Sequence, residues 1–276
     1  MDVKNLCTRA LSGLIYCLII VGCIFCGLYG VIALSVVIAI GACIEFAMIS
    51  HDMKYRNIPT LILEIAGCVC LCFSAYIYPI VIWIAIMMMR SIEELYINSD
   101  RPLHNLAHSF MSQIYIGIPM ALMVAVAYYL SPMILMAVFF LLWINDTGAY
   151  LVGCTFGRHR LFERISPKKS WEGFFGGLLF SLGASVLFYY FGDSFFGMSR
   201  INANLGIWMG LGAIVTVFGT WGDLIESMIK RNLQIKDSGK IIPGHGGLLD
   251  RIDSLLMVLP ALAVYLAIII SVSTFG

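Results

Sequence analysis

Residues 11–50, LSGLIYCLIIVGCIFCGLYGVIALSVVIAIGACIEFAMIS, form one nearly continuous apolar run. A bilayer core about 30 Å thick needs about 20 apolar residues per helix, so this run is long enough for two membrane-spanning helices. Gly27 and Gly30 lie near its middle, where a turn between the helices is expected. Lys4 and Arg9 precede the run as in a secretory signal, but no clear small-residue cleavage site follows. We therefore expect both helices to be retained.

The rest of the chain has the same apolar character. Of its 276 residues, 61% are hydrophobic and 12% are charged, whereas soluble domains carry about 25% charged residues. This composition excludes an ordinary soluble protein and predicts an all-α, polytopic integral membrane protein with about nine transmembrane helices. The expected limits are 11–28, 31–50, 59–76, 79–97, 110–130, 132–150, 173–191, 205–226 and 251–273.

The basic residues predict the orientation of these helices. With the N-terminus in the cytoplasm, 16 of the 17 Lys and Arg residues fall in inner segments, and only Arg200 lies outside. Such segregation follows the positive-inside rule. No repeat or polar linker divides the chain, so 1–276 is interpreted as a single membrane domain. Within it, 1–130 supplies hydrophobic helices and 131–276 supplies catalytic helices and cytoplasmic loops.

The first of two polar loops, residues 154–172, combines basic residues with a turn that leads into a helix. With Ser170 as its cap, the N-terminus of this helix can accept an anion, and two adjacent lysines would favour a phosphate. The alternative is a basic loop that only sets the membrane topology. The substrate-binding candidates in and just before this loop are Asp146, Ser166, Lys168, Lys169 and Ser170.

The second polar region begins with Asp223 and Glu226, which share one helical face, and ends with Asp250 and Asp253, which share another. Ionised residues near a bilayer are costly, so four carboxylates on two helix ends suggest a bound cation. Hard oxygen ligands favour Mg²⁺ over zinc. All four acids are therefore predicted metal ligands. The alternative is a set of structural ion pairs with the nearby basic residues Lys230, Arg231 and Arg251.

Between the two acidic pairs lies a glycine-rich stretch, residues 243–247 (PGHGG). Glycines allow close backbone approach, so the amides of Gly246 and Gly247 can cradle phosphate oxygens. His245 can donate to a phosphate or brace the loop. The pair His104 and His108 has no nearby third metal ligand, and we expect it to lie at the membrane interface.

These residues resemble the signature of the phosphatidate cytidylyltransferases, also called CDP-diacylglycerol synthases. The segments that carry the resemblance are Ser227-x-x-Lys230-Arg231, Lys236-Asp237-x-Gly239, Pro243-x-His245-Gly246-Gly247 and Asp250-Arg251-x-Asp253. Residues 146–150 (DTGAY) and 166–169 (SPKK) look like further motifs of that family, with Ser170 where threonine is more common. The N-terminal 130 residues resemble the family only as a helical membrane region.

The resemblance implies transfer of a cytidylyl group from CTP to phosphatidate in phospholipid biosynthesis, which releases pyrophosphate and leaves CDP-diacylglycerol in the membrane. Mg²⁺ is the implied cofactor, with a second cation left open. The implied partners are CTP, phosphatidate and membrane lipid, with a homodimer left open and no nucleic acid. The site would lie on the cytoplasmic side of a cell membrane. The implied catalytic residues are Ser227, Lys230, Arg231, Lys236, Asp237, His245 and Arg251.

Two other classes of function remain open at this point. A CTP-dependent kinase of a membrane alcohol would transfer the γ-phosphate and release CDP instead of pyrophosphate. A secondary transporter would couple ions through intramembrane carboxylates, but it would place them in mid-span within two related halves. The acids here cluster at one edge of the predicted membrane region, and no repeat is visible.

Overall fold

The computed structural model describes residues 3–50, 58–75, 77–201, 203–239 and 246–275. They are almost entirely helical, as predicted. The chain forms two compact units, each built from two stretches of sequence. Unit 1 contains Met1–Tyr128 and Ile235–Ile252, and unit 2 contains Tyr129–Gln234 and Asp253–Gly276. The single-domain interpretation stays a prediction.

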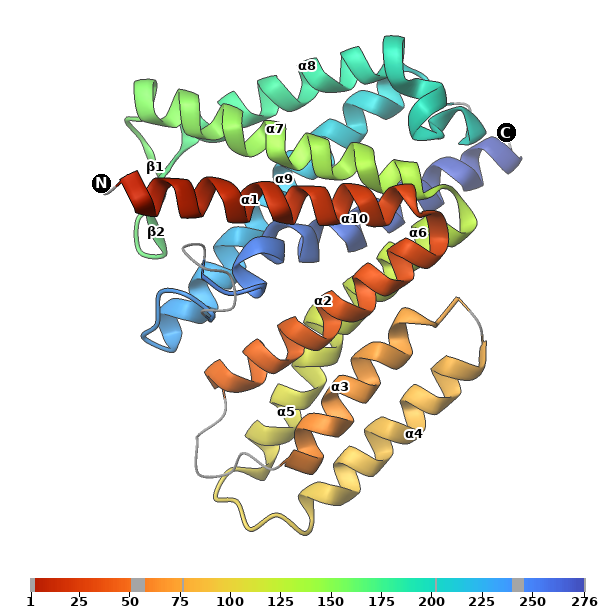
Figure 1. The fold of residues 1–276 in the computed structure, drawn as a ribbon, viewed down its shortest axis with the longest axis vertical. Helices are drawn as coiled ribbons and strands as arrows, with labels where there is room; N and C mark the ends of the chain where they lie inside the picture. The colour runs from red at the N-terminus through yellow and green to blue at the C-terminus, as the bar shows by residue number, and fades with distance from the viewer. Residues whose placement is uncertain (1–2, 51–57, 76, 202, 240–245, 276) are drawn as a thin grey trace. The chain divides into compact units, whose positions relative to one another are not determined.

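Unit 1 is a set of helices packed side by side. Its helices are α1 (Val3–Phe25), α2 (Gly27–Ser50), α3 (Ile58–Cys72), α4 (Ile77–Glu94), α5 (Pro102–Ser112) and α6 (Ile118–Tyr129), with a π-helical turn, Gln113–Gly117, joining the last two. Helix α3 packs against both α2 and α4, as Figure 1 shows. Gly27 has φ of 72°, a left-handed conformation that favours glycine, and this separates α1 from α2.

Unit 2 combines long helices with one short hairpin. Its elements are α7 (Pro132–Phe156), β1 (Arg160–Phe162), β2 (Ser166–Ser170), α8 (Trp171–Phe196), the 3₁₀ turn Met198–Ile201, α9 (Leu205–Asn232) and α10 (Leu249–Phe275), whose first turn belongs to unit 1. Helix α8 packs along both α7 and α9 (Figure 1). Side chains cap the N-termini of two of these helices. Ser131 accepts a hydrogen bond from Met133 N at the start of α7, and Asn204 accepts one from Ile207 N at the start of α9.

The antiparallel hairpin of β1 and β2 corrects the strictly all-α prediction. It lies within 154–172, which we interpreted as a loop. Its strands are only 3 and 5 residues long, and they lack the alternation of apolar and polar residues that predicts a strand.

Six helical segments among the described residues are long and apolar enough to cross a membrane. They are Gly27–Ile49, Pro102–Tyr129, Pro132–Phe156, Trp171–Phe196, Leu205–Asn232 and Leu249–Ser271. Two further apolar helices, Leu11–Phe25 and Ile58–Cys72, are shorter. Each of the nine predicted ranges overlaps a helix, but the structure supports six candidate spans, so the count of nine is not confirmed.

Two further details of the membrane region differ from or extend the prediction. The helix expected at 110–130 begins at Pro102, because α5, the π-helical turn and α6 run on as one segment.

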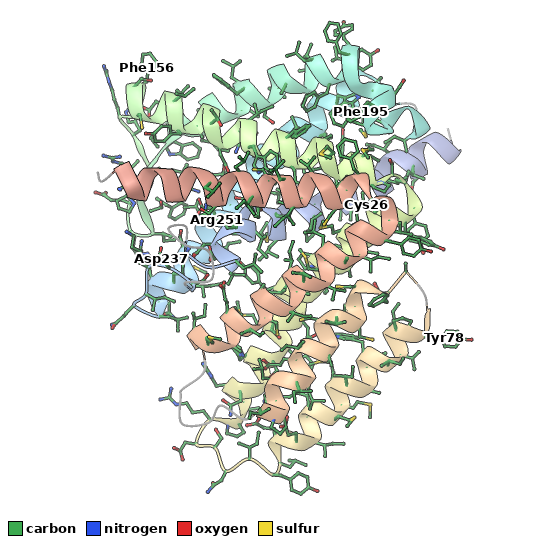
Figure 2. All side chains as sticks on the ribbon, in the orientation of Figure 1. Cys26, Tyr78, Phe156, Phe195, Asp237 and Arg251 are labelled. Atoms are coloured by element: carbon green, nitrogen blue, oxygen red, sulfur yellow. The ribbon has the colours of Figure 1, made fainter. Side chains whose placement is uncertain are left out.

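Apolar side chains such as Tyr78, Phe156 and Phe195 are exposed and project from the ribbon (Figure 2). A surface of this kind is typical of helices that face lipid.

A buried polar network joins α3, α4 and α5 within unit 1. The guanidinium of Arg90 donates to Glu94 Oε2 at 2.7 Å and to Ser109 Oγ at 2.9 Å. Ser109 in turn donates to Glu64 Oε1 at 2.5 Å. His108 is also buried, with its Nδ1 3.8 Å from that same oxygen of Glu64. These contacts offset part of the cost of burying the charges. The expected position of His104 and His108 at the membrane interface stays a prediction.

Replacing Arg90 by alanine should destabilise the protein strongly. The change leaves the buried carboxylate of Glu94 without its cation, a loss that costs about 3–5 kcal/mol in buried ion pairs. Thermal unfolding in detergent measures the effect. Arg101→Ala removes an exposed guanidinium and is the matched control, expected to change stability little. Equal midpoints for the two variants would contradict a stabilising role for the network.

Candidate active site

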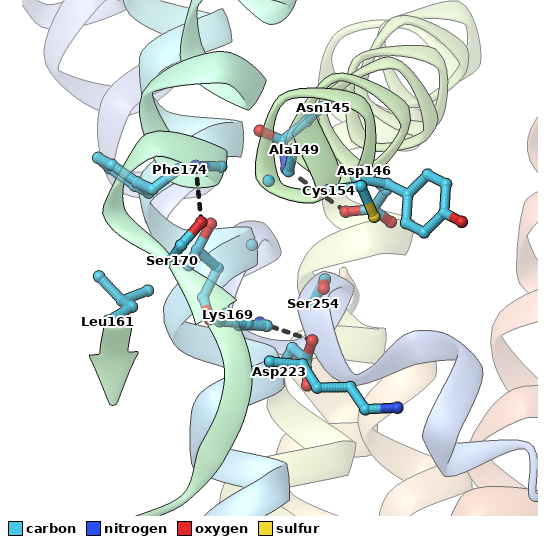
Figure 3. A pocket seen from close by; sticks show the side chains of 16 residues that line it. Asn145, Asp146, Ala149, Cys154, Leu161, Lys169, Ser170, Phe174, Asp223 and Ser254 are labelled. Carbon is cyan, nitrogen blue, oxygen red and sulfur yellow. Dashed lines mark hydrogen bonds and ion pairs between the residues drawn. The ribbon is translucent and has the colours of Figure 1, made fainter. Parts of the chain in front are cut away.

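A pocket of about 390 Å³ lies in unit 2 (Figure 3). Helix α7, the hairpin, the start of α8, the second half of α9 and Ser254 of α10 line it. Pockets for small ligands are usually about 300–1,000 Å³, with mostly apolar walls and a few polar groups. Here Leu161 and Phe174 supply apolar wall, and Lys168, Lys169 and other polar groups gather around them. The dimensions and lining suit a small charged ligand.

An ion pair spans this pocket. The ammonium of Lys169 lies 2.6 Å from Asp223 Oδ2, as Figure 3 shows, and it also donates to the backbone oxygen of Thr220 at 3.5 Å. The side chains of Lys169 and Asp223 are 26% and 35% exposed. Ion pairs in contact with solvent usually contribute about 1 kcal/mol or less. An incoming anion can therefore take Lys169 from Asp223 at little cost.

Three of the four predicted metal ligands lie on neighbouring turns of α9 and α10. Asp223 Oδ1 accepts a hydrogen bond from Ser227 Oγ at 3.2 Å. One turn further along α9, Glu226 is buried and pairs with Lys230 at 2.9 Å. Asp253 lies within hydrogen-bonding reach of Glu226 and within electrostatic range of Asp223. The alternative of a structural ion pair therefore applies to Glu226, whereas Asp223 faces the pocket.

The fourth predicted ligand, Asp250, belongs to unit 1. Its Oδ2 accepts hydrogen bonds from the backbone N–H of Ser238 at 3.0 Å and of Gly247 at 2.8 Å. Gly246 has φ of 88°, a conformation that side chains disfavour, and an added Cβ there would lie 2.6 Å from Asp250 Oδ2. Glycine at this position lets the backbone close around the carboxylate.

The described residues do not include any group of three His, Cys, Asp or Glu side chains arranged as metal ligands. The donor chemistry still suits a hard cation, because Asp223 offers carboxylate oxygens to the pocket beside the backbone oxygen of Thr220. In this structure the ammonium of Lys169 neutralises the carboxylate of Asp223, as a bound cation would. Metal binding by these residues stays a prediction.

Glu172, in the first turn of α8, bonds to the residues that lead into the hairpin. Glu172 accepts hydrogen bonds from the backbone N–H of Arg158 at 3.1 Å and of His159 at 3.2 Å. The ring of His159 lies 2.6 Å from the same carboxylate. An acid in the first turn of a helix also interacts favourably with the helix dipole. Glu172 thereby ties the residues before β1 to the first turn of α8, a role that the sequence reasoning missed.

Glycines allow the helices around the pocket to approach closely. An added Cβ on Gly177 of α8 would lie 2.5 Å from Asn145 Oδ1 of α7, and one on Gly222 of α9 would lie 2.7 Å from the backbone oxygen of Asp253. Small residues at such positions are typical of packing between membrane helices. Gly177 lets α8 approach α7, and Gly222 lets α9 approach α10 beside Asp253.

The other predicted site residues are placed as follows. Ser166 is half-buried in β2, Ser170 is buried at the start of α8, and Asp146 and Lys168 are exposed residues of the pocket. Basic Arg231 lies at the exposed end of α9 in unit 2. Within unit 1, Lys236, Asp237 and Arg251 are exposed, and Figure 2 labels the last two. His245 lies outside the described residues.

The sequence reasoning also missed several pocket residues. Tyr150, Cys154, Thr220 and Ser254 line the pocket, but none was a candidate. Only Tyr150 had a visible signal, because it ends the DTGAY segment. Thr220 contributes a backbone oxygen, which residue type does not reveal.

The sequence model described as the Cytidylyltransferase family matches residues 7–269, nearly the whole chain. The chain belongs to the cytidylyltransferase family. This confirms the resemblance drawn from residues 227–253 and extends it into the N-terminal helices, which the motifs left undecided.

Curated relatives in the family carry a more specific name. Phosphatidate cytidylyltransferase of Staphylococcus aureus (strain COL) is 48% identical over 128 residues, which is 46% of each chain. Phosphatidate cytidylyltransferase of Staphylococcus haemolyticus (strain JCSC1435) is 45% identical over 130 residues, again 46% of each chain. The chain therefore matches about half the length of these relatives.

Ser170 should be replaceable by threonine but not by alanine. Its hydroxyl oxygen accepts a hydrogen bond from Gly173 N at 3.1 Å and caps α8 beside the pocket. Loss of such a cap costs about 1 kcal/mol. Thermal unfolding of Ser170→Ala should show a lower midpoint, while Ser170→Thr keeps the hydroxyl and should match the parent protein. The cap assignment fails if alanine and threonine give the same stability.

Proposed function

We propose that this chain transfers a cytidylyl group from CTP to phosphatidate in phospholipid biosynthesis, which yields CDP-diacylglycerol and pyrophosphate. One observation carries the proposal: in a chain of the cytidylyltransferase family, Lys169 and Asp223 pair across a pocket large enough for a small ligand. The name of the curated relatives supports phosphatidate as the acceptor.

The reaction needs charge neutralisation more than a strong base. Phosphatidate is already an anion at neutral pH, so one of its phosphate oxygens can attack the α-phosphorus of CTP directly. A new phosphorus–oxygen bond forms, the bond between the α-phosphorus and its bridging oxygen to the β-phosphate breaks, and pyrophosphate leaves. Two anions must approach each other, so positioning and positive charge lower the barrier.

Lys168 and Lys169 are suited to bind the polyphosphate of CTP. Both lie on β2 and line the pocket, and β2 is held by its pairing with β1. When a phosphate group enters, Lys169 can exchange Asp223 for the phosphate, because its ion pair is open to solvent. The carboxylate of Asp223 is then free to accept another cation.

Mg²⁺ is the proposed cation. Asp223 and Asp253 of unit 2 are the residues we assign to it, and Glu226 is assigned a supporting part because Lys230 already pairs with it. Asp250 stays a metal ligand predicted from the sequence motif. When bound, Mg²⁺ would neutralise charge on the phosphates. A second cation remains part of the proposal, since these carboxylates exceed the charge of one divalent ion.

The remaining assignments come from the family resemblance. Ser227 orients Asp223 through its hydrogen bond and is near enough to take part in phosphate binding. The proposed catalytic residues include Lys230, Arg231, Lys236, Asp237, His245 and Arg251, whose basic members neutralise phosphate charge. The proposed substrate-binding residues include Asp146, Ser166, Ser170, Gly246 and Gly247. The distribution of basic residues supports a multi-pass protein of the cell membrane with this site on the cytoplasmic side. A homodimer in lipid is proposed as the assembly.

Product analysis tests the function directly. The full chain, purified in detergent, is given CTP labelled at its α-phosphate together with phosphatidate and Mg²⁺. We expect the label in a CDP-lipid and one pyrophosphate per CDP-lipid formed, with turnover lost when a chelator removes the metal. Release of labelled CDP with phosphorylation of a lipid alcohol would instead identify a kinase and reject the proposal.

Asparagine at Asp223 or Asp250 should abolish most activity. The change keeps size and one carbonyl oxygen but removes the charge that would hold Mg²⁺, so turnover should fall about a hundredfold or more. Turnover measured over a range of Mg²⁺ concentrations, together with thermal unfolding, separates metal loss from misfolding.

Two glutamate variants are the controls for this experiment. Glu163→Gln removes an exposed carboxylate from the turn of the hairpin and should leave turnover near that of the parent. Glu226→Gln should have a milder effect than either aspartate variant. Folded aspartate variants with normal turnover and unchanged Mg²⁺ dependence would reject the metal assignment even if the protein proved to be a cytidylyltransferase.

A further inference from the structure

A single acidic side chain interrupts the apolar run of α2. Glu45 is the one charged residue in 11–50, and its carboxylate is 2% exposed within unit 1. An ionised carboxylate in an apolar interior is costly unless donors compensate it. Its persistence there therefore requires strong partners.

The hydrogen-bond partners of Glu45 among the described residues belong to the second stretch of unit 1, in residues 235–239 and 246–252. The backbone N–H of Leu248 donates to Glu45 Oε1 at 2.8 Å, and that of Leu249 donates to Oε2 at 2.8 Å. The hydroxyl of Ser238 donates to Oε2 at 3.0 Å. Leu249 begins α10, and the first N–H groups of a helix have no acceptor within the helix. Glu45 supplies that acceptor from another helix, with charge-assisted bonds and favourable dipole interaction.

Two glycines of this segment close directly on the carboxylate. An added Cβ on Gly239 would lie 2.5 Å from Glu45 Oε1, and one on Gly247 would collide with Oε2. The backbone can reach the carboxylate at both points because neither residue has a side chain. A side chain at Gly239 or Gly247 would therefore clash with the carboxylate of Glu45.

Two residues of this segment also bond to Asp250. Ser238 donates its hydroxyl to Glu45 and its backbone N–H to Asp250. The backbone N–H of Gly247 donates to Asp250 as well. The segment is thus held between two carboxylates, one from α2 and one from α10. We propose that Glu45 is a positioning residue that sets the backbone around Asp250 and the start of α10.

The catalytic consequence rests on the proposed function, in which Asp250 binds Mg²⁺ and Gly246 and Gly247 bind phosphate. Glu45 touches none of the reacting groups in that scheme. Its loss should lower kcat and raise the Mg²⁺ concentration needed for half-maximal turnover, because the backbone around Asp250 loses its fixed position.

Hydrogen–deuterium exchange on the full chain in detergent tests the positioning role without reference to activity. In Glu45→Gln the amides of Leu248 and Leu249 lose a charged acceptor, so their exchange should accelerate about tenfold or more. The matched control is Glu64→Gln, which neutralises another buried carboxylate of unit 1 that bonds to Ser109 instead. It should leave exchange at 246–252 unchanged.

Kinetics on the same two variants test the link to the reaction. Glu45→Gln should lower kcat about tenfold per folded enzyme and shift the Mg²⁺ dependence upward, while Glu64→Gln should do neither. The proposal is overturned if exchange at Leu248 and Leu249 stays unchanged, if Glu64→Gln accelerates it equally, or if kcat survives intact. If the parent protein lacks cytidylyl transfer, the proposed function fails, and the exchange comparison still decides whether Glu45 positions the segment.

A milder pair of variants guards against misfolding of Glu45→Gln. Ser238→Ala removes one donor to Glu45 but keeps the carboxylate and both backbone bonds, so a smaller acceleration of exchange and a smaller fall in kcat are expected. Ser35→Ala removes a buried hydroxyl elsewhere on α2 and is the control. Identical exchange and kcat in the two serine variants would overturn the proposal.

Discussion

Charged groups in an apolar interior must be compensated by opposite charge or by hydrogen-bond donors, and this constraint decides much of the structure. Where the groups are buried, as in Arg90 with Glu94 of its own helix and Ser109 of α5, the contacts hold α4 against α5. Where they are open to solvent, as in Lys169 with Asp223, the pairing can be exchanged. The first kind of contact builds the fold, and the second kind is available for chemistry.

The same constraint connects the hairpin to the pocket. A strand of 5 residues has little stability of its own, and β2 consists largely of polar residues. Hydrogen bonds hold the hairpin. Glu172 accepts from the backbone N–H groups before β1, and Ser170 caps α8 at the end of β2. The hairpin that carries Lys168 and Lys169 is therefore held at both of its ends.

The sequence predicted the features that depend on neighbouring residues. Apolar runs indicated the helices because membrane spans need consecutive apolar residues, and Ser170 was identified as a cap from its place before a helix. The count of nine spans was not confirmed, and α4 illustrates one reason: it carries Arg90, Glu93 and Glu94 at its end. These charges are buried or half-buried, and Thr60, Asn105 and Ser109 of other helices bond to them, which composition does not reveal.

Features that depend on distant residues escaped prediction. Glu45 and Ser238 are 193 residues apart, and nothing in the apolar run around Glu45 indicates its partners. His108 was assigned to the interface because no metal ligand was near in sequence, whereas Glu64 of another helix lies beside it. Single-sequence patterns report periodicity and turn chemistry, and a long-range hydrogen bond leaves no trace in either.

The family signature itself is divided by the fold. Its first segment, Ser227 to Arg231, belongs to unit 2, the stretch 235–252 belongs to unit 1, and Asp253 returns to unit 2. Helix α10 is continuous through the last of these transitions, so Asp250 and Asp253 occupy successive turns of one helix. A spacing of three places these two carboxylates on one face of the helix. Glu45 acts at the start of the same helix, because it accepts the hydrogen bond of Leu249 N within unit 1.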